Sequence, residues 1–170
     1  EFAKALRRAR LLRGRLKTIE QRQRLKPLLD ELRRMNRRAK RLKLAIDRLS
    51  GGAEMERVSA AVLRQGGRTA RIVLRQAVKE KPEDTARPAA ELLIQLDKPA
   101  AVEAILARAR IADSAERTAS WIRMLPPTVS VMEQPTLQTL YHRFKQREGV
   151  ERRACVEVLD AYAEQVHSAD

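Results

Sequence analysis

The stretch LRRMNRRAKRLKLAI, residues 32–46, decides how the N-terminal third of this chain folds. It holds seven arginines and lysines in fifteen positions, yet an apolar residue recurs at every third or fourth place. Extended in both directions, the apolar positions alternate in steps of four and three, which is the heptad pattern of helices that pair along a seam. We expect a protein interface along this seam, formed with Ala39 by Leu28, Leu32, Met35, Leu42, Ile46 and Leu49.

A second apolar pattern runs from Phe2 to Ile19, and its register differs from that of the seam by two residues. Pro27 lies between the two patterns. Because proline lacks an amide and disfavours helix in the preceding residue, we expect the helix to kink or turn there. Two alternatives stay open for residues 1–50, the arm: a helical hairpin, favoured because the two segments match in length, or a coiled-coil helix that pairs with another chain.

The composition predicts an all-α protein. Aromatic residues make up only 3% of the chain, and helix formers outnumber strand formers. After Ser50-Gly51-Gly52, residues 53–170 show seven short apolar stripes at helical spacing, separated by Gly, Pro or capping residues. These stripes predict a compact multi-helix bundle or a short HEAT-like helical superhelix, which we call the body.

Three local features in residues 53–170 make specific structural predictions. The first apolar stripe should be the buried face of its helix, and it consists of Met55, Val58 and Val62. Asp97, followed by Pro99, is expected to cap one helix, and Asp113, with Glu116 three residues later, is expected to open another through a capping box.

Positive charge is confined almost entirely to the arm. Residues 1–50 carry eighteen Lys and Arg against five acids, a net charge of +13, whereas residues 51–170 carry eighteen against seventeen, a net charge of +1. Arginines spaced four apart repel one another on a helix, so folding does not require them. The residues expected to bind an external polyanion are Arg33, Arg34, Arg37, Arg38 and Arg41, supported by Arg7, Arg8, Arg10, Arg13 and Arg15.

Nucleic acid is the polyanion that this pattern favours. Arginine forks pair with phosphate, and a helix dense in guanidinium groups gains affinity by counterion release. RNA is preferred over duplex DNA, because arginine-rich helices read RNA by shape and phosphates. No aromatic platform accompanies these arginines, which argues against base stacking on single strands. The competing interpretations are an acidic protein surface, an anionic membrane surface and a merely solvated face.

The sequence gives little support to catalysis, and we expect no enzyme, cofactor or metal site. The only histidines, His142 and His167, lack the spacing of a helical metal site. The single cysteine, Cys155, lies on an apolar stripe and excludes an intramolecular disulfide, which fits the cytoplasm or another reducing compartment. No apolar run reaches a membrane span, and because the chain opens at Glu1-Phe2 without Met, we expect it to be part of a longer protein.

These observations lead to two functional hypotheses. In the first, the chain is a non-enzymatic helical adaptor whose arm binds RNA and whose body binds a protein partner. In the second, it is a protein-interaction scaffold or oligomerisation module, in which the arm pairs with a partner helix, an acidic protein surface or a second copy of the chain.

Overall fold

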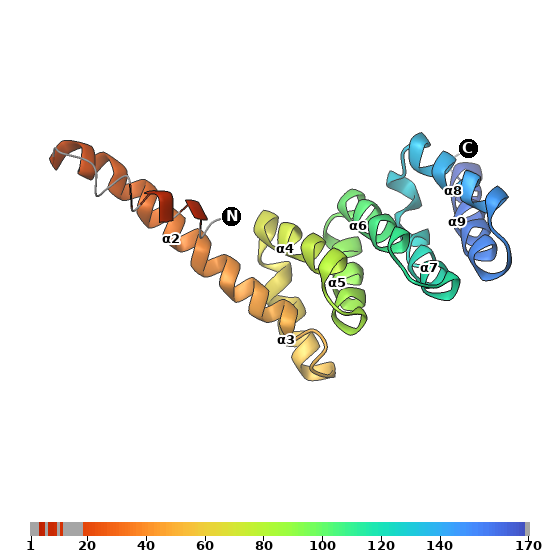
Figure 1. The fold of residues 1–170 in the computed structure, drawn as a ribbon, viewed down its shortest axis with the longest axis horizontal. Helices are drawn as coiled ribbons and strands as arrows, with labels where there is room; N and C mark the ends of the chain where they lie inside the picture. Colours follow the sequence, from red (N-terminus) through yellow and green to blue (C-terminus); the bar gives the residue numbers. More distant parts are fainter. Residues whose placement is uncertain (1–3, 6, 10, 12–18, 169–170) are drawn as a thin grey trace.

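The protein is all-α throughout the part of the chain that the structure, a computed structural model, describes. The described residues are 4, 5, 7–9, 11 and 19–168, and they contain no β-strand. Figure 1 shows an elongated stack of helices, in which the long helix α2 forms one end and the pair α8 and α9 forms the other. The fold-class prediction is therefore confirmed, with the helices arranged side by side along the chain.

Helix α2 spans Ile19–Asp47 and continues through Pro27, so a turn at this proline is wrong, and a kink, the other expected outcome, stays a prediction. Leu25, Leu29 and Leu32 form a small cluster with Ala9, whereas the buried residues nearer the end of α2 belong to the main core. The apolar face thus changes direction along one unbroken helix. Whether the arm forms a hairpin or pairs with another chain stays a prediction.

Seven α-helices and one 3-10 helix follow α2. Each helix contacts mainly the next one or two along the chain, as α4 does with α5 and α6, and as α8 does with α9. This connectivity is that of a short superhelix, in which each helix buries its apolar face against sequence neighbours. The elements are α3 Ala53–Arg64, α4 Gly67–Glu80, α5 Glu83–Leu96, α6 Lys98–Arg110, α7 Ala115–Ile122, η1 Pro126–Val131, α8 Gln134–Gln146 and α9 Gly149–His167.

One hydrophobic core runs through the stack and extends into α2. Its largest fully buried members include Trp121, Leu74, Leu93 and Ile105. Alanines fill many of the remaining core positions. Since alanine side chains are short, they let neighbouring helices approach closely, which accounts for a continuous core in a chain with few aromatic residues.

The capping predictions have different outcomes. Asp97 caps α6 as expected, because its Oδ1 accepts a hydrogen bond from the Ala100 amide at 3.2 Å. The predicted cap Asp113 is wrong by one residue: Ser114 caps α7, and its Oγ accepts from the Arg117 amide at 3.2 Å. Asp113 instead accepts a hydrogen bond from the Arg117 guanidinium at 2.6 Å.

The predicted buried stripe of α3 is also wrong. Met55, Val58 and Val62 remain 40%, 59% and 41% exposed. The helix buries Ser59, Ala60 and Leu63 instead. Serine and alanine permit a close approach of the neighbouring helices beside the fully buried Leu63, so α3 packs through this face and leaves its apolar stripe outside.

Candidate nucleic-acid interface

The five arginines that are expected to be the main contacts to a polyanion form one exposed face of α2. Successive residues of a helix turn by 100°, so the five side chains fall within an arc of about 140°. Arg33 and Arg37 lie farthest from the buried Leu42 and Ile46, and Arg38 lies at the edge next to Leu42. All five are exposed to solvent. We call this surface the arginine face, and it consists of Arg33, Arg34, Arg37, Arg38 and Arg41.

Most of the arginine face has no carboxylate partner among the described residues. Arg33 Nη1 lies 3.1 Å from Asp30 Oδ1, in an exposed contact. Arg38 Nη2 donates a hydrogen bond to the backbone oxygen of Gln65 at 3.1 Å, which leaves its charge unneutralised. In the described part of the chain, Arg34, Arg37 and Arg41 make no ion pair.

The basic residues of the body are paired to a much greater extent. Arg71 Nη1 lies 3.6 Å from Asp97 Oδ2. Arg123 Nε lies 3.1 Å from Glu157 Oε2. Arg75 and Lys79 share the carboxylate of Glu103, and the hydrogen bond from Arg75 is the main reason why the pKa of Glu103 lies below its ordinary value.

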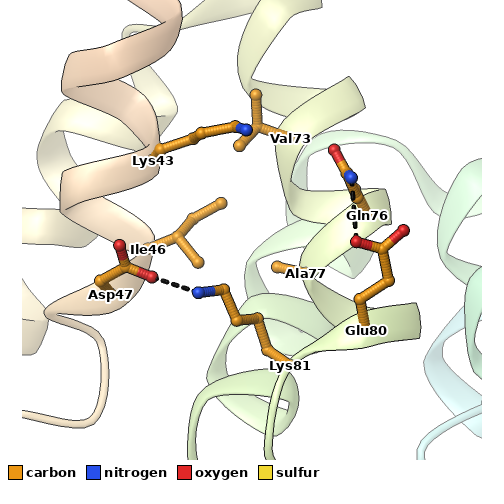
Figure 2. Close-up of a pocket in the computed structure, with 8 residues that line it drawn as sticks. All are labelled: Lys43, Ile46, Asp47, Val73, Gln76, Ala77, Glu80 and Lys81. Carbon is orange, nitrogen blue, oxygen red and sulfur yellow. Dashed lines mark hydrogen bonds and ion pairs between the residues drawn. The ribbon is translucent and has the colours of Figure 1, made fainter.

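The last acidic residue of α2 is also engaged with the body. Lys81 Nζ lies 2.5 Å from Asp47 Oδ1 across a groove between α2 and α4, which Figure 2 shows. The groove measures about 240 Å³, and Ile46, Val73 and Ala77 contribute its apolar lining. Because Asp47 forms an ion pair with Lys81, its carboxylate does not neutralise an arginine of α2.

The supporting arginines are described only in part. Arg7 and Arg8 are exposed. Arg10, Arg13 and Arg15 lie outside the described residues. The structure therefore brings together the five members of the arginine face on one helix, and the contribution of the earlier arginines stays a prediction.

The apolar seam divides into two halves. Leu42, Ile46 and Leu49 are at most 2% exposed and belong to the main core, so the chain's own helices cover this half. Leu32 and Met35 are partly buried, and Leu32 packs in the cluster around Leu29. Leu28 is 50% exposed. Only the first half of the seam is thus open to a partner helix.

The residues with potential for catalysis are dispersed. Cys155 is fully buried, and desolvation, with a smaller contribution from the charge of Glu151, raises the pKa of its thiol to about 11. Within the described residues, no cluster of three His, Cys, Asp or Glu side chains could hold a metal ion. None of the described helices combines the length and apolar character needed to cross a bilayer.

Sequence reasoning did not detect how α2 is attached to the body. The hydrogen bond of Arg38 to the end of α3 and the ion pair between Lys81 and Asp47 join residues 27 and 34 positions apart. No periodicity or motif links such positions, so only the packing of the helices reveals them. Comparisons with protein-family models, curated proteins and solved structures find no match for this chain.

Proposed function

We propose that this chain is a non-enzymatic helical adaptor whose arm binds RNA through the arginine face and whose body binds a protein partner. The observation that supports this most is the contrast in pairing. Arg34, Arg37 and Arg41 lack carboxylate partners among the described residues, whereas many of the body's basic residues have them. Like charges held together without internal compensation favour an external anion.

The geometry of the arginine face suits a phosphate backbone. Its end members, Arg33 and Arg41, are eight positions apart, so the face extends over roughly 12 Å along the helix. Guanidinium groups pair with phosphate through two parallel hydrogen bonds, and each contact releases condensed counterions. Structured RNA is preferred over single strands, because the exposed face of α2 carries no aromatic side chain on which a base could stack.

A charge-matched pair of triple variants tests this proposal. Replacing Arg34, Arg37 and Arg41 by Gln should weaken binding to a fluorescent RNA hairpin, measured by anisotropy at low salt, by at least about thirtyfold, because three phosphate contacts are lost. The control replaces Arg57, Arg110 and Arg153 by Gln, which removes the same charge from exposed positions of the body. Equal losses in the two variants would contradict a specific arginine face.

The scaffold hypothesis has one observation in its favour. Leu28, in the first half of the heptad seam, is 50% exposed, and the next seam residues Leu32 and Met35 are only partly buried, so this part of the seam keeps apolar surface for a partner helix. Leu28→Asp tests it by sedimentation. If the arm pairs with another copy of the chain, the wild type has a dimeric mass and this variant a monomeric mass. Monomeric mass for both proteins would exclude self-association through this part of the seam.

A further inference from the structure

The outer side of α3 carries an apolar stripe that the described chain leaves uncovered. Met55, Val58 and Val62 are separated by three and four residues, so they lie in line along two turns of the helix. Their side chains are 40%, 59% and 41% exposed. RNA gains nothing from this row of methyl and thioether groups, so the RNA-binding hypothesis leaves the stripe unexplained.

The stripe lies on the same side of the molecule as the arginine face. Helices α2 and α3 are joined by a short turn, and Arg38 of α2 reaches Gln65 at the far end of α3, so the two helices run antiparallel in contact. On α3, the side towards α5 is formed by residues such as Ala60 and Arg64, which line a groove against α5. By helical rotation, the apolar stripe of Met55, Val58 and Val62 lies on the side of α3 that faces away from that groove.

The face of α2 that meets α4 contains Ile46 and Lys43, which line the groove of Figure 2. Arg41 and Arg48 lie on the opposite side of α2 by helical rotation. Because α4 and α5 cover one side of the α2–α3 pair, the apolar stripe and these arginines share the other side. The result is an apolar stripe with Arg41 and Arg48 on its α2 side, and Arg41 also belongs to the arginine face.

We infer that this composite surface, formed by Met55, Val58 and Val62 with Arg41 and Arg48, binds an acidic amphipathic helix of a protein partner. The apolar stripe matches anchor residues at helical spacing, as in helix-in-groove recognition, and the arginines match flanking carboxylates. A second copy of the chain would bring two strongly basic arms together, which charge repulsion opposes. This inference rests on the protein-binding half of the proposed function.

Methyl NMR of the intact chain provides the test, because the protein has four methionines, of which Met55 lies on the proposed surface. Met124 and Met132 lie in the body and serve as internal references. The probe is a synthetic peptide of about 14 residues, close to four helical turns, with leucines along one face and glutamates elsewhere. Its titration should shift the Met55 methyl signal, assigned with Met55→Leu, and leave the two reference signals unchanged.

Two matched comparisons make the result decisive. A peptide with glutamine in place of glutamate should bind at least about tenfold more weakly, because the arginine border loses its partners. The neutral double substitution Val58→Ser and Val62→Ser should weaken the acidic peptide by about tenfold. These side chains are exposed, so an unchanged circular dichroism melt confirms that the variant is folded.

The inference is overturned if the Met55 signal stays fixed up to about 1 mM peptide, the weak end of the affinity scale. It is equally overturned if the signal moves only with protein concentration, which indicates self-association, or only with phosphatidylserine vesicles, which indicates a lipid surface. The serine variant should still bind the RNA hairpin. Loss of peptide binding with RNA binding retained in this variant supports the inference. A wild type that binds the RNA hairpin but whose Met55 signal does not respond to the peptide shows that this inference fails while the RNA-binding hypothesis stands.

Discussion

At the scale of single residues, Cys155 illustrates how burial decides chemistry. Its side chain is fully buried beside Glu151, and desolvation raises the pKa of the thiol to about 11. Because the thiolate is the reactive form, a buried thiol with this pKa is a core residue and not a nucleophile. The position of Cys155 on an apolar stripe of the sequence predicts the same buried role.

The first prediction concerns this thiol. At pH 8 the native protein should resist alkylation by iodoacetamide, and unfolding by guanidinium should expose Cys155 to full labelling, as followed by mass spectrometry. Since the folded pKa lies above the ordinary value of 9.0, the proton contributes stability that is complete below about pH 9 and is lost as pH rises towards 11. Rapid labelling of the native protein would contradict the buried position.

The second prediction concerns Gly66, at the junction of α3 and α4. A Cβ atom at this position would lie 2.4 Å from Ala70 Cβ and 2.7 Å from Leu42 Cδ2. Gly66→Ala should therefore lower the free energy of unfolding by about 1–3 kcal/mol, measured by urea denaturation, because the core must shift to admit the methyl group. Gln65→Ala, at an exposed neighbouring position, should change stability by less than about 0.5 kcal/mol. A loss equally small for Gly66→Ala would contradict the close packing of α4 on α2.

At the scale of helices, the periodicity of apolar residues predicted where the helices lie but not how they pack. The spacing of apolar residues predicted seven helices in residues 53–170, and α3 to α9 occupy that range. It could not predict which face of α3 is buried, because Ser59 and Ala60 pack there in preference to Met55. Apolar spacing reports where a partner surface exists, but it does not say whether the partner belongs to the same chain.

Pro27 shows the same limit for local rules. The general cost of proline in a helix predicted a kink or turn, yet α2 continues through this residue without a turn. A helix of this length loses one hydrogen bond at proline and keeps those on either side, while Leu29 is held in the cluster with Ala9. For the arginine face, in contrast, the sequence was sufficient to place the five side chains on one face, because they lie on one continuous helix.

The third prediction follows from this geometry. Pro27→Ala should restore an amide that can donate to the carbonyl of Gln23 and should stabilise the surrounding turns by up to about 3 kcal/mol. Hydrogen exchange of the peptide that covers residues 19–31 should slow accordingly, whereas the exposed control Gln23→Ala should have little effect. Unchanged exchange in Pro27→Ala would indicate that the helix is interrupted at this position.

At the scale of the whole molecule, charge and fold are organised along the same axis. The basic arm lies at one end of the stack, with α2 packed on α3 and α4, and the near-neutral helices follow it. Because the last turns of α2 belong to the main core through Leu42, Ala45 and Ile46, the helix that carries the arginine face is anchored to the body and gives it a support that a free tail lacks. Such a support limits the entropy lost when the arginines bind an anion.

The fourth prediction is the measurement that tests the central claim most directly: the salt dependence of RNA binding by the wild type and by the two triple glutamine variants. With about five phosphates neutralised, log Kobs of the wild type should fall with log salt at a slope of about −4. Loss of Arg34, Arg37 and Arg41 should reduce this slope by about 2 to 3, and the body control should keep it within about 1 of the wild type. A flat wild-type titration, or equal slopes for the two variants, would contradict an arginine face that binds phosphate.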